Sequence, residues 1–471
     1  MERNEIPFLS VAELGRLLQS REVSPVEATE AYLERIERVD PAINAYITVS
    51  HEAARQAARE AEQAISAGNY LGPLHGVPVA VKDQFNSKGI RTTAGSTILW
   101  DNVPDEDAEV VARLKQAGAV LLGKLNLSEF ALGESFHHPG GTPRNPWDLT
   151  RNPGISSSGS AVATAAFLCA TSLAEDTGGS TRIPASWTGL AGLRPTWGRV
   201  SRRGVVPVCW SMDTVGPISR SVEDCAITFQ AIAGHDPQDP YTWNTPVPDY
   251  RQELLGGVGG LRVGVVREKM TGDDLDPQVK SAVEAAVAQL GELGASVREV
   301  SIPIVEKAGA VSKCITDLEG ASVHYQGLKE RAGEYDHNTR VRLLTAILTP
   351  AQAYYKAQKL RTMVRQAVLD ALDEVDVLVL PTSPAPSPKI PDGPGIKSRE
   401  DAASRIFGVR NFTGAFNLAG VPALAIPCGF TPDNLPVSLQ IVGRPMAEGT
   451  VMRVGHSYQQ VTDWHTRRPP I

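Results

Sequence analysis

Short apolar or β-branched runs alternate along the chain with longer stretches of helical character. The short runs, which are typical of buried strands, occupy residues 77–81, 119–122, 261–266, 296–300, 377–380, 423–430 and 436–442. The helical stretches occupy residues 24–37, 51–65, 107–118 and 350–374, with a further one that begins at 276–277. Strands that alternate with helices predict an α/β fold in which helices flank a largely buried sheet.

Helix-start and helix-stop signals support these assignments. Ser24-Pro25-Val26-Glu27 is a capping-box pattern with proline at the first helical position. Residues 51–65 are rich in Ala, Glu, Gln and Arg, which favour helix. Residues 107–118 have an acidic first turn and end on a glycine. The first 70 residues (1–70) are therefore predicted to form an N-terminal helical region.

No internal repeat and no clear domain boundary is visible along the chain. Residues 235–260 are rich first in Pro and Asp and then in Gly, which is typical of a surface connection. Residues 381–397 carry six prolines and are predicted to form an irregular loop. We therefore expect residues 1–471 to form a single large domain.

Composition and charge narrow the classes of protein. The chain has 471 residues, enough for a large core, and 46 Lys+Arg against 53 Asp+Glu give a net charge of −7. Without a basic run, non-specific binding to nucleic acid or anionic membranes is disfavoured. No signal peptide or membrane span is visible, and the five scattered cysteines contain no CxxC motif. We expect a cytoplasmic protein without a disulfide framework.

The common catalytic motifs are missing from the sequence. There is no G-x-S-x-G elbow, P-loop or HExxH motif, and the glycine cluster at 256–260 precedes a strand instead of following one. His137-His138 is the one adjacent histidine pair, which fits a solvated loop or a pocket rim. Metal catalysis and Ser-His-Asp catalysis are both disfavoured, and no metal or cofactor is expected.

Two segments of small and hydroxylated residues stand out, at 154–161 and at 176–185. Within the second, Thr177-Gly178-Gly179-Ser180 allows a sharp turn that directs several backbone N–H groups at one point, as an oxyanion hole requires. A serine at the end of such a turn would meet a substrate carbonyl carbon. The alternatives are a plain strand-to-helix loop or a phosphate-binding loop.

A nucleophilic serine needs a base, and the sequence offers Lys82. This lysine follows an apolar five-residue run, so its side chain is expected to leave the end of a buried strand. Burial disfavours the ammonium form, and a neutral amine near pH 7 can accept a proton. The alternative is a strand-end lysine whose amine reaches solvent.

Several long motifs in order resemble the amidase signature family. They are Gly76-Val77-Pro78-Val79-Ala80-Val81-Lys82-Asp83, Thr92-Thr93-Ala94-Gly95-Ser96, Gly123-Lys124-Leu125-Asn126-Leu127-Ser128-Glu129-Phe130, Arg144-Asn145-Pro146-Trp147-Asp148, the segments at 154–161 and 176–185, Gly192-Leu193-Arg194-Pro195-Thr196 and Val215-Gly216-Pro217-Ile218. They span a core at 74–224, and residues 423–444 resemble the closing strands of the family. The resemblance implies a large twisted mixed sheet with helices on both faces, in which residues 261–471 supply the remaining α/β elements and the substrate pocket.

The resemblance also implies a Ser–cis-Ser–Lys triad. Ser180 matches the nucleophile that forms the acyl-enzyme, Ser156 matches the serine next to a cis peptide bond, and Lys82 matches the terminal base. The backbone N–H groups of Thr177, Gly178, Gly179 and Ser180 match the oxyanion hole. A hydroxyl that both donates and accepts can bridge the lysine and the nucleophile, which suits this set of residues.

Some positions depart from the family pattern. Ile155 and Ser158 stand where the family usually has glycine, and Glu175 replaces a residue that is commonly a small threonine. Trp187-Thr188 differs from the usual smaller aromatic residue and cysteine. None of these departures removes a member of the triad.

Six further residues are candidates for supporting or substrate-binding roles. Arg182 is expected either to bind a substrate carboxylate or to form an ion pair with Asp176, and Ser157 to hold its loop or the leaving group. The remaining candidates, expected to line either the acyl pocket or the core, are Phe136, Trp210 and Met212.

The resemblance favours a stand-alone amidase that hydrolyses amide bonds, with aryl amides, carbamates (urethanes) and esters as further substrates. Its expected partners are a small amide-type substrate and water, without nucleic acid or membrane, and a homodimer is left open. The alternative is the amidase subunit of a tRNA-dependent amidotransferase, which feeds ammonia to another subunit. Trp210-Ser211-Met212-Asp213 departs from the Ser-Ser-Leu-Asp pattern associated with that subunit. A non-catalytic binding protein is disfavoured because all three triad positions are present.

Overall fold

The computed structural model describes residues 2–132, 139–391 and 410–471. Within them one sheet contains eleven strands in the order β1-β3-β2-β4-β6-β5-β10-β11-β9-β7-β8. The strands are β1 (Tyr46–Val49), β2 (Pro78–Lys82), β3 (Val120–Leu125), β4 (Thr171–Glu175), β5 (Ala191–Arg194), β6 (Val215–Ser219), β7 (Arg262–Val266), β8 (Ser296–Val300), β9 (Val377–Pro381), β10 (Ala423–Phe430) and β11 (Pro436–Val442).

The sheet is mixed, as the family resemblance implied. Strand β2 runs parallel to β3 and β4, and β7 runs parallel to β8 and β9. Antiparallel pairs connect these two groups through β6, β5, β10 and β11, and β1 pairs antiparallel with β3 at one edge. Strands β2, β3 and β4 are buried along their whole length; β2 and β3 read as mainly apolar runs, whereas β4 contains Thr171, Ser172 and Glu175.

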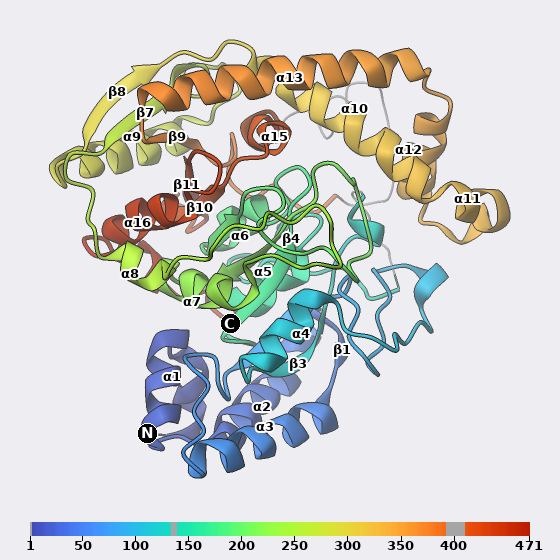
Figure 1. Cartoon of the computed structure of the whole chain (residues 1–471), viewed down its shortest axis with the longest axis vertical. Helices are drawn as coiled ribbons and strands as arrows, with labels where there is room; N and C mark the ends of the chain where they lie inside the picture. Colours follow the sequence, from blue (N-terminus) through green and yellow to red (C-terminus); the bar gives the residue numbers. More distant parts are fainter. Residues whose placement is uncertain (1, 133–138, 392–409) are drawn as a thin grey trace.

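Helices pack around this sheet, so the predicted α/β class is confirmed (Figure 1). They are α1 (Val11–Ser20), α2 (Pro25–Ile43), α3 (His51–Ser66), α4 (Glu109–Gln116), α5 (Ser158–Ala165), α6 (Arg182–Thr188), α7 (Val222–Ile232), α8 (Tyr250–Leu254), α9 (Pro277–Glu292), α10 (Val305–Val323), α11 (Tyr325–Arg331), α12 (His337–Ile347), α13 (Ala351–Glu374), α15 (Arg410–Ala419) and α16 (Glu448–Gln459). In Figure 1 the N-terminal helices (blue) and α13 (orange) lie at opposite ends of the molecule.

The predicted capping box at the start of α2 is present. The Ser24 side chain accepts from the backbone N–H of Glu27, and the Glu27 carboxylate accepts from the backbone N–H of Ser24. The helix extends beyond the predicted end, to Ile43, because its apolar positions continue to face the core and Asn44 closes it in the left-handed conformation.

Several parts of the fold were not foreseen, including strands β4, β5 and β6. Strand β1 interrupts the N-terminal region that was predicted to be helical, because its four residues pair with β3 and form the edge of the sheet. Helices α10, α11 and α12 were not assigned from the sequence. The predicted surface connection at 235–260 contains α8, whose Tyr250 is buried, so part of it packs inward. Residues 392–397 of the predicted loop at 381–397 lie outside the described residues.

None of the helices in the three described ranges combines the length and apolar character that a membrane span requires.

Candidate active site

Two parallel strands place the predicted base at their carboxyl ends. Strands β2 and β4 pair in register, with Val81 opposite Leu173, so their last residues, Lys82 and Glu175, end at the same edge. Both side chains are completely buried. The loops that precede α5 and α6 carry the two predicted serines and start from this edge, which is where α/β proteins generally bind ligands.

The first triad contact is formed. Lys82 Nζ lies 2.8 Å from Ser156 Oγ, and Ser156 is also buried. The lysine therefore turns inward, which rules out the alternative in which its amine reaches solvent. The neighbouring Ser157 donates from Oγ to the backbone carbonyl of Glu175 at 3.3 Å. Ser157 thus ties the Ser156 loop to the end of β4, one of the roles expected for it.

The peptide bonds of the described residues are all trans, so the cis bond expected beside Ser156 is not present. A trans bond at a non-proline residue is favoured by about 3–4 kcal/mol. The chain turns instead at Gly154, whose φ of 115° is open to glycine, and the contact between Ser156 and Lys82 is made with the trans linkage.

The loop of residues 176–180 is organised around the Asp176 carboxylate. This carboxylate accepts hydrogen bonds from the backbone N–H groups of Gly179, at 2.8 Å, and Thr181, at 3.2 Å. Gly179 has a φ of 120°, and a Cβ there would lie 2.5 Å from Thr413 Oγ1. The position therefore requires glycine for both its conformation and its space.

The oxyanion-hole prediction needs one adjustment. The Gly179 N–H is directed at Asp176, because it holds the loop closed. The N–H groups of Thr177, Gly178 and Ser180 make no hydrogen bond within the described parts of the chain. These three donors remain the predicted oxyanion hole.

Ser180 is the member of the triad that the structure leaves partly exposed. Its hydroxyl makes no hydrogen bond to Ser156 among the described contacts, whereas Ser156 and Lys82 are in direct contact. The loop that carries Ser180 is joined to the Ser156 loop through Glu175 and Ser157. The role of Ser180 as nucleophile stays a prediction of the family resemblance.

Arg182 forms the expected ion pair with Asp176. Its Nε and Nη2 atoms donate to the two carboxylate oxygens at 3.0 Å each, and Nη1 and Nη2 donate to Gln440 and Asn417. Burial alone would raise the pKa of Asp176, but Arg182 and Arg194 outweigh it and hold that pKa well below its usual range. The guanidinium is fully buried and occupied by protein partners, so it is not placed to bind a substrate carboxylate.

Replacing Arg182 with methionine is expected to lower the free energy of unfolding by about 3–5 kcal/mol, because the Asp176 carboxylate loses its main buried partner. Urea denaturation at neutral pH measures the change. The control is Arg298→Met, which removes an exposed ion pair with Glu374 and should have a much smaller effect. Equal effects of the two substitutions would contradict the structural role of Arg182.

Burial makes the neutral amine more accessible at Lys82 than at an exposed lysine. Burial lowers the pKa of the Lys82 amine below its ordinary value, and it does so despite the acidic neighbours Glu175, Asp213 and Asp176. Burial likewise raises the pKa of Glu175, with Asp213 adding to the effect. A lysine in this setting can serve as a base near neutral pH, as the sequence suggested.

Two acidic residues near the lysine, Glu175 and Asp213, were not assigned a role from the sequence, and neither was the side chain of Thr177. Glu175 Oε2 lies 3.6 Å from Lys82 Nζ, and the Thr177 hydroxyl contacts both Glu175 Oε1 and Asp213 Oδ1. The departure of Glu175 from the family pattern was the available signal. Asp213 approaches from a distant loop, which no local pattern could reveal.

The remaining candidates lie away from the triad or outside the described residues. Trp210 is 48% exposed and packs on Tyr241 and beneath Arg202 at the surface. Met212 is fully buried in an apolar core cluster. Phe136 and the pair His137-His138 belong to the segment that the structure does not describe. Surface stacking accounts for the position of Trp210, and core packing, the expected alternative, accounts for that of Met212.

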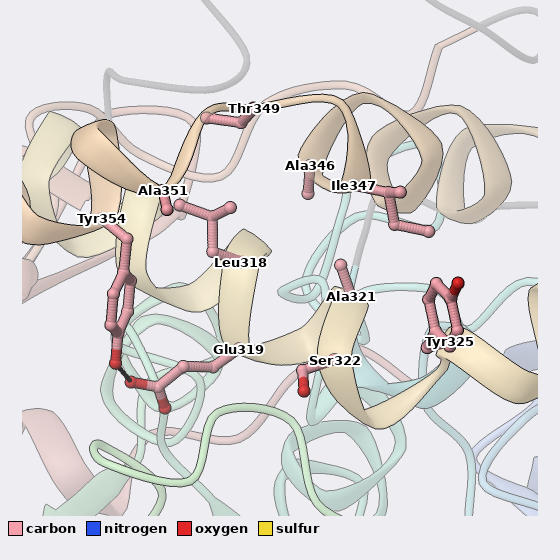
Figure 2. Close-up of a pocket in the computed structure, with 10 residues that line it drawn as sticks. All are labelled: Leu318, Glu319, Ala321, Ser322, Tyr325, Ala346, Ile347, Thr349, Ala351 and Tyr354. Atoms are coloured by element: carbon pink, nitrogen blue, oxygen red, sulfur yellow. Dashed lines mark hydrogen bonds between the residues drawn. The ribbon is translucent and has the colours of Figure 1, made fainter.

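A cavity of about 650 Å³ lies on the helical side of the molecule, at the junction of α10, α11, α12 and α13 (Figure 2). Its wall includes Glu319, whose carboxylate accepts from the Tyr354 hydroxyl at 2.9 Å. The other lining residues are Leu318, Ala321, Ser322, Tyr325, Ala346, Ile347, Thr349 and Ala351. No triad residue lines it, so this cavity is separate from the candidate active site.

Among the described residues, no group of His, Cys, Asp and Glu side chains is arranged to hold a metal ion.

Comparisons with known proteins show which proteins the chain resembles. A model of the Amidase family matches residues 27–452. The chain is 43% identical to a glutamyl-tRNA(Gln) amidotransferase subunit of Geobacter metallireducens, over 99% of this chain and 100% of that protein. The solved glutamyl-tRNA(Gln) amidotransferase subunit of Thermotoga maritima is 32% identical, with a TM-score of 0.82 over 100% of this chain and 98% of that one. A structure of a vestigial protein complex, described as revealing the origins of an s-triazine catabolic enzyme, is 34% identical with a TM-score of 0.89, over 96% and 98% of the two chains.

These relatives correct two expectations. The stand-alone amidase is wrong as the first choice, since relatives about 40% identical over the full chain are amidotransferase subunits. The expectation that the partners include no nucleic acid is wrong for the same reason. The triad motifs are common to stand-alone amidases and amidotransferase subunits, so they could not distinguish the two classes. The departure from the Ser-Ser-Leu-Asp pattern at 210–213 was given too much importance, because Trp210 lies at the surface.

The predicted triad positions, the mixed sheet and relatives that match over nearly their whole length point to one family. This chain is a member of the amidase signature family, whose enzymes are hydrolases acting on carbon–nitrogen bonds.

Proposed function

We propose that this chain is the amide-hydrolysing subunit of a tRNA-dependent amidotransferase, and that the ammonia it releases is transferred to glutamyl-tRNA. The observation that carries the proposal is the similarity to glutamyl-tRNA(Gln) amidotransferase subunits, which extends over 99% of this chain and 100% of the relative at 43% identity. No large segment of either chain is left over for a different activity.

The chemistry of the proposal follows from the residues at the ends of β2 and β4. Ser180 attacks the carbonyl carbon of the amide donor, its proton passes to Ser156, and Ser156 gives its own proton to neutral Lys82. The leaving nitrogen takes a proton back along the same path, and ammonia departs. Water then attacks the carbonyl carbon of the acyl-enzyme and its proton passes to Lys82; the ester bond to Ser180 breaks, the acid product leaves, and the proton returns through Ser156 to Ser180. Backbone N–H groups of the loop stabilise the oxyanion.

The acidic charge of the chain is compatible with a tRNA substrate. A net charge of −7 argues only against direct, non-specific binding of this chain to phosphates. In the proposed complex, other subunits bind the tRNA, and this chain supplies ammonia. A buried base and a partly exposed serine are sufficient for that task.

Reconstitution tests this function. The purified chain is mixed with the other subunits of an amidotransferase, glutamyl-tRNA(Gln), ATP with Mg²⁺ to activate the glutamyl carboxylate, and glutamine that carries ¹⁵N in its side-chain amide. We expect ¹⁵N to appear in glutaminyl-tRNA, and Ser180→Ala in the same mixture to abolish the transfer. Ammonia release that is unaffected by the other subunits and by tRNA, with no labelled aminoacyl-tRNA, would contradict the proposal.

A further inference from the structure

The Thr177 hydroxyl lies between two buried carboxyl groups. Its Oγ1 atom is 2.5 Å from Glu175 Oε1 and 2.7 Å from Asp213 Oδ1. A hydroxyl has one proton, so it can donate to only one of these oxygens. The other oxygen lies equally close, and two ionised carboxylates would leave that contact without a hydrogen. One of the two carboxyl groups must therefore carry a proton and donate it to Thr177.

The surroundings decide which carboxyl group carries this proton. The Asp213 oxygens accept backbone N–H bonds from Val208 and Cys209 at 2.9–3.0 Å, and such bonds stabilise the charged form. Glu175 has no comparable support. Its Oε1 atom contacts only Thr177, and its Oε2 atom is buried without a hydrogen-bond partner in the described structure. The proton belongs on Glu175, with Thr177 donating to Asp213.

The charged groups that face Glu175 agree with this assignment. Lys82 approaches Glu175 from β2, and Asp213 is linked to Glu175 through the Thr177 hydroxyl. Asp176 follows Glu175 in the chain, and Arg194 approaches from β5. Arg194 and Arg182 are paired with Asp176, and the charge of Lys82 is the one nearest to Oε2. Burial raises the pKa of Glu175, as does the Asp213 carboxylate, and these effects outweigh the opposing effect of Lys82.

We propose that Glu175 is a positioning residue of the triad, which stays protonated through the Thr177–Asp213 contact and so leaves the Lys82 amine neutral. An ionised Glu175 at 3.6 Å would hold Lys82 as an ammonium ion, unable to accept a proton from Ser156. With the carboxyl proton in place, Lys82 takes the proton of Ser156 while Ser156 takes that of Ser180, and Glu175 keeps its own. The inference rests on the proposed function, because that function makes Lys82 the base.

Infrared spectroscopy of the full chain at pH 7 tests the proton directly. A protonated carboxyl absorbs above the amide band, whereas a carboxylate absorbs below it. The spectrum of the wild type minus that of Glu175→Gln should show the carboxylic-acid band of Glu175. Other buried acids, such as Glu129 and Asp224, are present in both proteins, so their bands cancel in the difference. Glu299→Gln, which removes a surface carboxylate, should show no such band. A carboxylate band in the Glu175→Gln difference would overturn the inference, whether or not the chain is active alone.

The pH dependence of Ser180 labelling by phenylmethanesulfonyl fluoride gives the second readout. Glutamine resembles a protonated glutamate, so Glu175→Gln should leave the acid limb of the labelling rate nearly in place. Asp213→Asn frees Thr177 to donate to Glu175, which then ionises and holds Lys82 as ammonium. We expect that acid limb to move up by about one pH unit, and the double variant to restore it. A purely structural role, or the simple loss of a negative charge at 213, would not shift the acid limb of the labelling rate to higher pH.

The outcomes separate the inference from the proposed function. If Ser180→Ala is labelled as fast as the wild type, the nucleophile of the proposed function is wrong. If Ser180 is labelled but Glu175→Gln moves the acid limb down by about a unit or more, the nucleophile stands and the protonated Glu175 is wrong. Should Asp213→Asn fail to fold, the infrared difference for Glu175→Gln still decides.

Discussion

Replacing Ser180 with alanine is expected to lower the rate of amide hydrolysis by about four to six orders of magnitude. Ser180 is the partly exposed hydroxyl at the end of the loop held by Asp176, and no other hydroxyl of that loop can take its place, since Thr177 is engaged by two carboxyl groups. Without the nucleophile no acyl-enzyme forms, and only the oxyanion donors and substrate binding remain. Ammonia release from glutamine, in the assembled complex, measures the loss.

The matched control for this substitution is Ser186→Ala. Ser186 is buried, lies six positions further along in α6, and makes no hydrogen bond through its side chain within the described structure. It should keep normal turnover. Thermal unfolding of Ser180→Ala should match the wild type, so that a loss of rate reports chemistry. Normal turnover by Ser180→Ala would show that another residue is the nucleophile.

Lys82→Met is expected to lower the acylation rate by at least about three orders of magnitude, because Ser156 loses the acceptor for its proton. Methionine keeps most of the side-chain volume, so packing at the end of β2 is retained. Since burial lowers the pKa of the amine, the wild-type rate should rise with pH as Lys82 loses its proton, at a pH below that of an exposed lysine. The variant should lose this dependence. Rates of Ser180 labelling between pH 5 and pH 10 (about the range set by the ordinary pKa values of the groups involved) test both points.

A second buried lysine supplies the control. Lys124 on β3 is equally buried and donates to the Phe85 carbonyl and the Thr92 hydroxyl, both at 2.6 Å. Its burial also lowers its pKa, yet it contacts neither serine of the triad. Lys124→Met is expected to reduce stability and to leave the pH dependence of labelling unchanged for the folded fraction. A loss of that dependence in Lys124→Met, with none in Lys82→Met, would exchange the roles of the two lysines.

The buried strands of the fold were predictable because burial on both faces leaves a local record. The runs at 77–81 and 119–122 became β2 and β3, and the last two predicted strands match β10 and β11 residue for residue. Strands β5 and β6 escaped detection because glycine and proline interrupt their apolar character. Helices α10 to α12 escaped because they pack on other helices such as α13, and their apolar pattern is correspondingly weak.

The candidate site was likewise predictable from the sequence only in part. The position of Lys82 at the end of a buried strand and the glycine at 179 were readable from neighbouring residues. The choice between two roles for Arg182 was settled only when Asp176, Asn417 and Gln440 came together around it. The motifs could not distinguish a stand-alone amidase from an amidotransferase subunit, because they reflect the chemistry that both share and not the complex in which the chain works.

The sequence by itself determined several of the buried strands, the lysine at the end of one of them and the glycine-rich loop at 176–180, because each depends on residues close together in the chain. Tertiary structure alone decided the protonation of the site. Asp213 and Thr177 meet Glu175 beside Lys82 only after β2, β4 and β6 assemble. The proton affinity of a buried group depends on the charges and dipoles around it, and these come from distant parts of the chain.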